Sequence, residues 1–201
     1  MARSDSIPGE SIVRLCLEAG FARAGVCEAA PSEHEQAIRQ WIGGGRHGEM
    51  AWLADRLEER LDPERVVPGV RSIILVADQY ASREDEASSA PVEQVVGERE
   101  GGVARYARGR DYHKVIKKRL HSLADALRAA HPEHAFRAFT DTAPVLEREH
   151  AVRAGMGWIG KHTLLIDPDL GSYLLLGGIL TTLPISPPAT QRTVADHCGT
   201  C

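Results

Sequence analysis

A continuous apolar run near the middle of the chain, Ser72-Ile-Ile-Leu-Val-Ala77, most restricts how this protein can fold. Its β-branched residues, and its position between Pro68-Gly69 and a polar segment, are typical of a strand that is buried on both faces. Such a strand lies inside a sheet that other layers of structure cover. We therefore expect residues 72–77 to form a central strand.

Helix-like and strand-like segments alternate along the rest of the sequence. Apolar spacing, a capping box at Ser32 and Glu35, and Pro144 predict helices over residues 10–20, 32–42, 112–130 and 145–154. Strand-like runs cover residues 21–27, 135–139, 163–166 and 173–180. The alternation predicts an α/β fold, namely a layered α+β sandwich with a mixed central sheet flanked by helices. Residues 82–100 lack periodicity and are expected to form a surface loop within the domain.

Composition places the chain among ordinary globular proteins, with 201 residues, 43% hydrophobic residues, 26% charged residues and a net charge of −4. No apolar run reaches the length of a membrane span, and the amino terminus has no secretory signal. We therefore expect a cytoplasmic protein that does not contact a membrane. Basic residues cluster between Arg105 and Arg119, and we favour a solvated helix face with its lead-in loop over a nucleic-acid site.

The last five residues, His197-Cys198-Gly199-Thr200-Cys201, contain a Cys-x-x-Cys pair. One tight loop with this spacing presents two thiolates, whereas an iron–sulfur cluster takes four cysteine sulfurs. We expect the pair to open a metal or redox motif whose other ligands this chain lacks, with a zinc ribbon or a dithiol as alternatives. Cys16 and Cys27 lie in core-like patterns, so a disulfide framework is not expected.

The segment Gly155-Met-Gly-Trp-Ile-Gly160 matches the dinucleotide-binding fingerprint and, with Lys161, most of the phosphate-loop pattern. Both motifs need a strand before the glycines and a helix after them, and this sequence predicts the reverse order. His162 also stands where a phosphate loop needs a hydroxyl for magnesium. We therefore expect no nucleotide site, and expect these glycines to let the backbone approach another large, flat ligand.

Asp141 is the main candidate for a catalytic acid. It follows the predicted strand 135–139 and precedes a predicted helix, which is where open α/β sheets place their ligand crevice. To donate a proton at neutral pH, its carboxyl must be buried against an apolar surface, because an exposed aspartate is already ionised. The structural alternative is that Asp141 caps the helix that starts near Pro144.

Several segments of the chain form an ordered set. They are Gly48-Glu-Met-Ala-Trp-Leu53 with Arg60-Leu-Asp-Pro63, Arg110-Asp-Tyr-His113, Asp141-Thr-Ala-Pro-Val-Leu-Glu-Arg148, Gly155–Lys161 and the terminal cysteines. Together they resemble epoxyqueuosine reductase, a cobalamin-dependent iron–sulfur enzyme family of queuosine-tRNA maturation. The resemblance implies a nitroreductase-related cobalamin-binding domain over residues 1–192. Residues 193–201 would open a ferredoxin-type module whose remainder is missing after Cys201.

The resemblance implies an oxidoreductase that reduces epoxyqueuosine to queuosine at the wobble position of tRNA. Electrons would reach cobalamin from two [4Fe-4S] clusters, supplied by a small redox protein or another donor, and Asp141 would donate the proton. It also implies a monomer. Because the cluster ligands are incomplete and the carboxy-terminal tRNA-binding surface is absent, we expect this chain to bind cobalamin without turning over.

The resemblance also assigns candidate site residues. Those expected to bind cobalamin are Arg60, Ala104, Asp111, Tyr112, His113, Asp141, Arg148, Lys161, Leu165 and Leu176, and those expected to bind a cluster are Cys198 and Cys201. Each has an ordinary alternative, such as an ion pair of Arg60 with Glu64, a helix cap at Asp111, or simple packing. His113 is not expected to bind cobalt, because the family binds cobalamin without such a ligand.

Three other functions fit parts of the sequence. A corrinoid reductive dehalogenase would share the cofactors, but those enzymes are usually exported and this chain has no export signal. A cobalamin carrier would bind the corrinoid without needing a ferredoxin-like segment for electron transfer. A zinc-stabilised nucleic-acid-binding module would fit the terminal cysteines, but the acidic balance of the chain disfavours it.

Overall fold

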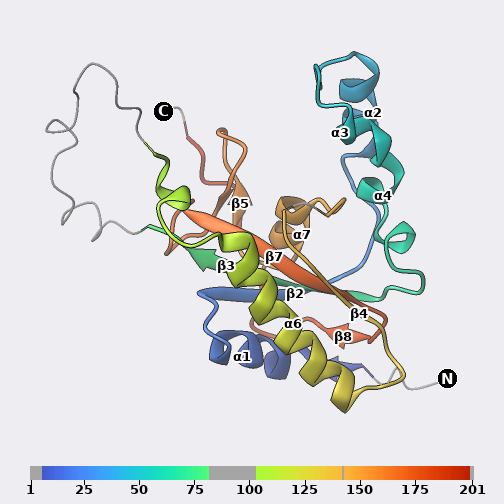
Figure 1. The fold of residues 1–201 in the computed structure, drawn as a ribbon, viewed down its shortest axis with the longest axis vertical. Coiled ribbons are helices and arrows are strands. Elements are labelled where there is room, and N and C mark those ends of the chain that lie inside the picture. Colours follow the sequence, from blue (N-terminus) through green and yellow to red (C-terminus); the bar gives the residue numbers. More distant parts are fainter. Residues whose placement is uncertain (1–5, 82–102, 142, 200–201) are drawn as a thin grey trace, which may run out of the picture.

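The fold is built on a four-stranded sheet, seen in a computed structural model that describes residues 6–81, 103–141 and 143–199. In sheet order the strands are β2 (Arg23–Glu28), β3 (Ser72–Gln79), β7 (Leu174–Thr181) and β4 (Phe136–Phe139). The predicted central strand is confirmed, because β3 pairs with β2 on one edge and with β7 on the other. Strand β7 runs past the end of β4, which pairs only with Gly178 to Thr181 (Figure 1).

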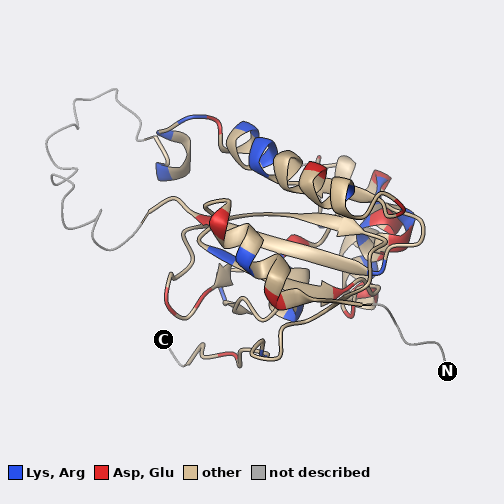
Figure 2. Ribbon diagram, turned by 90° about the horizontal axis from the view of Figure 1, so that it is seen from below, with Lys and Arg blue, Asp and Glu red and all other residues tan. Residues whose placement is uncertain are grey.

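Helices cover both faces of this sheet. They are α1 (Gly9–Glu18) and α6 (Tyr112–Ala130) on one face, and α7 (Glu147–Arg153) on the other. The strand β3 shows why two layers form: Ile74 and Val76 pack with α1 and α6, whereas Ile73 and Leu75 pack with α7. Figure 2 shows basic residues gathered on the first half of α6, as expected for a solvated helix face.

The remaining elements are short. They are β1 (Ile7–Pro8), α2 (Glu35–Gly43), α3 (Trp52–Asp55), α4 (Leu57–Leu61), η1 (Pro63–Arg65), η3 (Arg105–Ala107), β5 (Trp158–Ile159), β6 (Leu165–Ile166) and β8 (Ile185–Ser186). The helices α2 to α4 form a lobe that projects from the sheet (Figure 1). Among the described residues, no helix is long and apolar enough to cross a membrane.

The predicted layered α/β fold is confirmed, but three details differ. All pairings within the four-stranded sheet are antiparallel, and the parallel pair is β1 with β8. The helix predicted near Pro144 begins at Glu147. The predicted capping box at Ser32 is wrong, because His34 precedes α2 and the Ser32 hydroxyl bonds to Glu149 instead. The surface loop predicted over residues 82–100 lies outside the described residues, and the division at residue 192 remains a prediction.

Candidate active-site cleft

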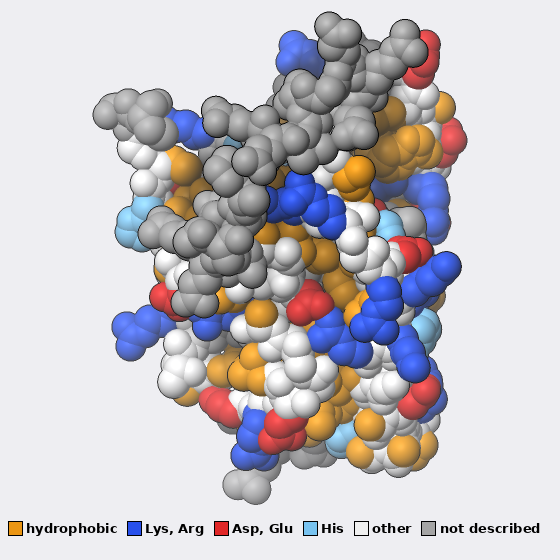
Figure 3. All heavy atoms as spheres, turned by 60° about the vertical axis from the view of Figure 1, so that its left-hand side comes forward, with side chains coloured by type: hydrophobic (Ala, Val, Ile, Leu, Met, Phe, Trp, Pro, Cys, Tyr) orange, Lys and Arg blue, Asp and Glu red, His pale blue; other side chains and the backbone are white. Residues whose placement is uncertain are grey.

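A cleft of about 340 Å³ opens where β7 extends past β4. Its lining residues are Tyr80, Tyr106, Tyr112, Asp141, Glu147, Arg148, Leu164, Leu165, Ser172, Leu174, Leu175 and Leu176. Strand β7 supplies an apolar floor, while the amino-terminal end of α6 and the segment before α7 supply polar groups. Figure 3 shows one side of the molecule, where hydrophobic and basic side chains are intermixed. The cleft therefore combines apolar surface with a few polar groups, as ligand sites commonly do.

All four tyrosines of the chain form a continuous aromatic wall at this cleft. Ring centroids are 5.5 Å apart for Tyr173 and Tyr80, 6.3 Å for Tyr80 and Tyr106, and 6.1 Å for Tyr106 and Tyr112, all packed edge to face. The sequence singled out only Tyr112. Tyr80 and Tyr173 meet because β3 and β7 pair antiparallel, so finding them required the strand register.

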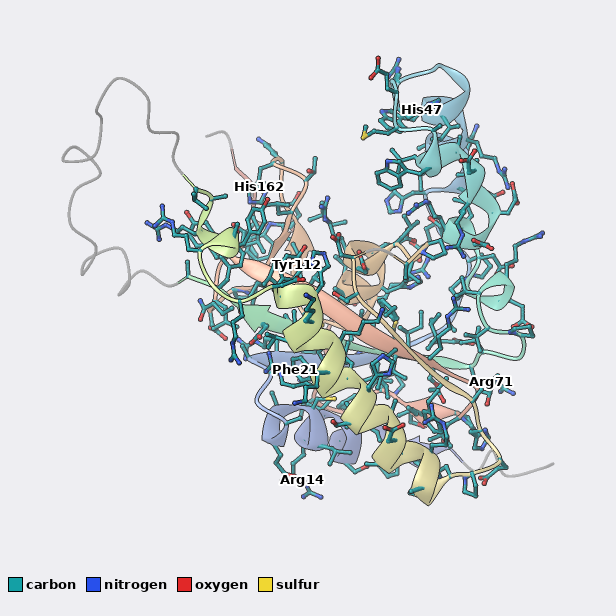
Figure 4. All side chains as sticks on the ribbon, viewed as in Figure 1. Arg14, Phe21, His47, Arg71, Tyr112 and His162 are labelled. Atoms are coloured by element: carbon teal, nitrogen blue, oxygen red, sulfur yellow. The ribbon has the colours of Figure 1, made fainter. Side chains whose placement is uncertain are left out.

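The carboxyl of Asp141 is held by two neighbours from α6. Its Oδ2 accepts a hydrogen bond from the Tyr112 hydroxyl at 3.2 Å and lies 2.9 Å from His113 Nε2. The opposite nitrogen, His113 Nδ1, lies 3.0 Å from Oδ1 of Asp111. Figure 4 shows Tyr112 at the start of α6, where its side chain lines the cleft. The structure therefore joins four predicted site residues, Asp111, Tyr112, His113 and Asp141, in one hydrogen-bonded group.

The structural alternative for Asp141, a helix cap, is wrong. Its side chain is 59% exposed in the chain alone, and its burial against a bound cofactor stays a prediction. It does not cap α7, because Leu146 is the residue before that helix and no side chain caps it. Its backbone φ of 42° lies in the left-handed region, which is unusual for a residue with a side chain. The rule for ligand crevices in open α/β sheets, which pointed to Asp141, applies to parallel strands and so does not explain its position, because β4 is antiparallel to β7.

The charges around Asp141 favour a protonated imidazole beside it. The hydrogen bond to Asp141 is the largest effect and raises the pKa of His113, with Asp111 adding to it against partial desolvation. The hydrogen bond from His113 in turn lowers the pKa of Asp111, which also caps α6 by accepting from the His113 backbone N–H. The predicted cap is confirmed. With both nitrogens protonated, His113 donates to both carboxylates.

Glu147, which the sequence did not single out as a site residue, is the most perturbed carboxyl of the cleft. It is the first residue of α7, and its Oε1 is shielded from solvent without a hydrogen-bond partner among the described residues. Burial, followed by the charge of Asp141, raises its pKa to about 7, although the Asp141 backbone N–H donates to it. Sequence spacing gave no signal, because residues 143–146, which lead into Glu147, are not helical.

Arg60 lies beside the cleft rather than in its lining. Its guanidinium stands over the Trp52 ring, 5.2 Å from the centroid, and its buried Nε has no partner among the described residues. Desolvation lowers its pKa, and attraction to Glu147 opposes this, which places Arg60 near that carboxyl. The alternative ion pair with Glu64 is wrong, because Glu64 accepts from the Gly69 backbone N–H at 2.8 Å.

The other predicted residues divide between the cleft and its surroundings. Arg148, Leu165 and Leu176 line the cleft, with Arg148 donating to the Thr163 carbonyl at 2.9 Å. Ala104 and Lys161 do not line it: Ala104 is exposed ahead of η3, and Lys161 donates to the Gly199 carbonyl. Their predicted contacts with a cofactor remain untested.

The segment that carries Cys198 is fastened to the domain. The Gln191 amide bonds to both backbone groups of Val26, at 3.2 and 2.7 Å, and the His197 ring packs on Trp158 at 5.2 Å. Cys198 is half-buried, whereas Cys201 lies outside the described residues. Within the described ranges, no group of three or more His, Cys, Asp or Glu residues could hold a metal ion.

Two glycines of the 155–160 segment lie against the chain's own backbone. Helix α7 precedes them and strand β6 follows, which confirms the reversed order that argued against a nucleotide site. A Cβ atom on Gly155 would lie 2.7 Å from the Arg192 carbonyl, and one on Gly157 would collide with the Ile166 carbonyl. At Gly155 and Gly157 the close approach is therefore to the chain's own backbone, and the predicted approach to a ligand stays a prediction.

This fold and cleft define a class of α/β proteins that includes reductases of known structure. A family model described as "Epoxyqueuosine reductase QueG, DUF1730" matches residues 60–142. The solved epoxyqueuosine reductase of Streptococcus thermophilus superposes with a TM-score of 0.78 at 27% identity, covering 96% of this chain and 50% of that chain. A reductive dehalogenase described as B12-dependent shares only the fold, with a TM-score of 0.52 and 16% identity.

Curated relatives carry the same name. Epoxyqueuosine reductases from Xanthomonas campestris pv. campestris and Pseudomonas aeruginosa are 41% and 39% identical over 100% and 96% of this chain. The chain spans about half the length of these relatives, 55% and 52% respectively. The resemblance predicted from the sequence motifs is therefore confirmed: the chain is related over its whole length to epoxyqueuosine reductases.

Proposed function

We propose that this chain is the part of an epoxyqueuosine reductase that binds cofactor and substrate, and that the enzyme reduces epoxyqueuosine in tRNA to queuosine. The observation that carries the proposal is the acid group Asp141, held by Tyr112 and His113 at the mouth of an apolar cleft. Similarity to curated epoxyqueuosine reductases along the whole chain supports it. The structure of one related reductase contains an epoxyqueuosine-modified tRNA stem loop, which supports tRNA as the substrate.

The residues of the cleft fit a broad, flat cofactor such as cobalamin. Leucines of β7 and β6 offer an apolar surface, the tyrosine wall offers ring edges, and Arg148 lies at the rim. The buried Nε of Arg60 and Oε1 of Glu147 lack partners in the described chain, so each could bond an amide group of a corrin. When bound, cobalamin would supply the reducing cobalt, while the protein supplies position and protonation.

In this proposal, Asp141 protonates the epoxide oxygen. The hydrogen bonds from Tyr112 and His113 both reach Oδ2, so they fix the direction in which the other oxygen, Oδ1, faces. A ligand that covers the cleft would remove water from Asp141 and favour its protonated form. His113 keeps this orientation because its two ring nitrogens lie 3.0 Å from Asp111 Oδ1 and 2.9 Å from Asp141 Oδ2.

Cys198 and Cys201 are proposed as two ligands of a [4Fe-4S] cluster. Such a cluster needs four cysteines, and the buried Cys16 and Cys27 do not supply the others because both lie in the hydrophobic core. The contacts of Gln191 and His197 fix the path of this segment along the domain. The electron donor, the monomeric state and the cellular location stay predictions.

A matched pair of exposed leucines tests the cofactor site. Leu164 lines the cleft at 37% exposure, whereas Leu17 lies on α1, away from it, at 45% exposure. Absorbance titration of the purified chain with cobalamin should show a stoichiometric spectral change for the wild type and for Leu17→Trp. We expect Leu164→Trp to bind roughly tenfold more weakly, because its indole would occupy the cleft. The absence of binding by folded wild-type chain would refute the assignment.

A further inference from the structure

Reduction of an epoxide to an alkene consumes more protons than Asp141 can hold. The ring oxygen leaves as water, so the balanced reaction takes two electrons and two protons for each epoxide reduced. In the proposed function the two electrons come from the reduced corrinoid, and Asp141 supplies one proton. The chain must therefore offer a source for the second proton. This inference rests on the proposed function, because only epoxide reduction requires that proton.

Glu147 is placed to be that source. It lines the same cleft as Asp141, and the backbone N–H of Asp141 donates to its carboxyl. Its Oε1 is shielded from solvent and has no hydrogen-bond partner in the described part of the chain. A half-buried carboxyl with one shielded, unbonded oxygen is costly to ionise, which shifts Glu147 toward the neutral acid.

The charged groups that face Glu147 leave this preference intact. Arg60, from α4, attracts its carboxylate but is held over the Trp52 ring, and Arg148 directs its guanidinium to the Thr163 carbonyl. Asp141 repels the ionised form, and Tyr112 of α6 lies within the field of both carboxyls. The balance raises the pKa of Glu147 to about 7, with burial as the largest cause.

We propose that Glu147 is the proton store of this cleft: it holds a proton at neutral pH and passes it to the Asp141 carboxylate after Asp141 has protonated the epoxide oxygen. The Glu147 O–H bond breaks and an Asp141 O–H bond forms, so Glu147 becomes the carboxylate and Asp141 is an acid again. Asp141 then protonates the same oxygen a second time, and that oxygen leaves as water. Because Glu147 acts through Asp141, it is a positioning residue and not a group that touches the substrate.

The first test needs no cofactor or substrate. Difference infrared spectroscopy of the chain, titrated from about pH 5 to about pH 9, should show a protonated carboxyl whose band disappears near neutral pH. We expect Glu147→Gln to lack this band and Glu149→Gln, altered two residues along the same helix, to keep it. The band's absence from wild type, or its persistence in Glu147→Gln, would overturn the proposal even if the proposed function is correct.

The second test uses the cofactor-loaded enzyme that contains this chain. Below about pH 7, where wild-type Glu147 holds its proton, Glu147→Gln should lower kcat for epoxyqueuosine reduction roughly tenfold with KM unchanged, and Glu147→Asp should restore part of the rate. Glu149→Gln should leave the shape of the pH profile unchanged. If the wild-type enzyme does not reduce epoxyqueuosine, the proposed function fails. If it does and Glu147→Gln keeps the wild-type pH profile, only the proton store is refuted.

Discussion

Two glutamates on the same short helix, Glu147 and Glu149, meet the cost of burial in opposite ways. Glu149 accepts hydrogen bonds from the Ser32 hydroxyl at 2.7 Å, from the Glu33 backbone N–H at 2.9 Å and from Arg153 at 2.7 Å. Glu147 has an unbonded, solvent-shielded oxygen and a carboxylate neighbour in Asp141. The helix is the same, so the partners decide which form of each carboxyl is stable.

The pKa values of the two groups follow this difference. Burial alone would raise the pKa of Glu149, but the bonds from Ser32 and Glu33 and the charge of Arg153 outweigh it and lower that pKa. At Glu147 nothing outweighs burial, and its pKa rises to about 7. A buried carboxyl group with enough hydrogen-bond donors is stable as the carboxylate and links two segments of the chain. A buried carboxyl group without such donors is more stable with its proton bound. Glu149 therefore contributes to the fold, and Glu147 is available for chemistry.

The pH dependence of stability should separate the two groups most strongly. The pKa of Glu147 rises from 4.5 to about 7 on folding, so the unfolded chain releases its proton over that range while the folded chain keeps it. The contribution of Glu147 is complete below pH 4.5 and declines as the pH rises to about 7, by on the order of 3 kcal/mol in total. We expect Glu147→Gln to abolish this decline.

Urea unfolding of wild type and Glu147→Gln at a series of pH values measures this contribution as the difference between the two proteins. Taking the difference cancels the neighbouring His150, whose pKa burial lowers to about 4 and whose contribution changes in the opposite direction. A difference between the two proteins that stays constant from about pH 5 to about pH 8 would show that Glu147 does not titrate as proposed.

Removing the charge of Glu149 should cost stability at neutral pH. Glu149→Gln keeps the shape of the side chain but weakens its bonds to Ser32, Glu33 and Arg153, which predicts a loss of roughly 2 kcal/mol. Because its pKa is lowered on folding, the stabilisation is present above pH 4.5 and is lost as the pH falls through its folded pKa. The difference in the free energy of unfolding between wild type and Glu149→Gln should therefore be smaller at acidic pH than at neutral pH. This is the reverse of the result expected for Glu147→Gln.

A smaller change at Ser32 tests whether the donors, rather than burial, set the state of Glu149. Ser32→Ala removes one hydrogen bond to a charged group and should cost about 1.5 kcal/mol at neutral pH. It should also raise the pKa of Glu149, since one of the groups that favour its ionised form is gone. Exposed Ser122, whose hydroxyl donates to the Lys118 carbonyl of its own helix, provides the control as Ser122→Ala. Equal losses of stability in the two variants would contradict this explanation.

The sequence predicted the elements of the fold better than their relations. Apolar periodicity predicted α6 over residues 112–130, as the structure has it, because the apolar face of a helix is formed by residues three or four positions apart. The direction of strand pairing is not local, and the sheet expected to be mixed is antiparallel through all four strands. That pairing brings Tyr80 beside Tyr173, which no local pattern indicates.

The candidate site shows the same limit. The segment of Asp111, Tyr112 and His113 was recognisable because its residues are consecutive and open a helix. That they point to Asp141 could not be predicted, because the contact joins residues 28 or 29 positions apart. The partner of Ser32 is 117 residues away, so a local capping box was the natural but wrong interpretation. Glu147 stands out only when its burial and its missing partner are known.

The change with the smallest expected effect on stability is at Arg60, and it tests which groups set the pKa of Glu147. Its positive charge favours the ionised form of Glu147, so Arg60→Gln should raise the pKa of Glu147 further. Loss of its contact with the Trp52 ring should cost only about 0.5–1 kcal/mol. Arg56→Gln is the matched control, because Arg56 is paired with Glu59 and is not among the charges that act on Glu147.

In the infrared titration, we expect the carboxyl band to disappear at higher pH in Arg60→Gln and at the wild-type pH in Arg56→Gln. An unchanged midpoint in Arg60→Gln would mean that burial and Asp141 alone set the proton affinity of Glu147, and that Arg60 serves only to pack against Trp52.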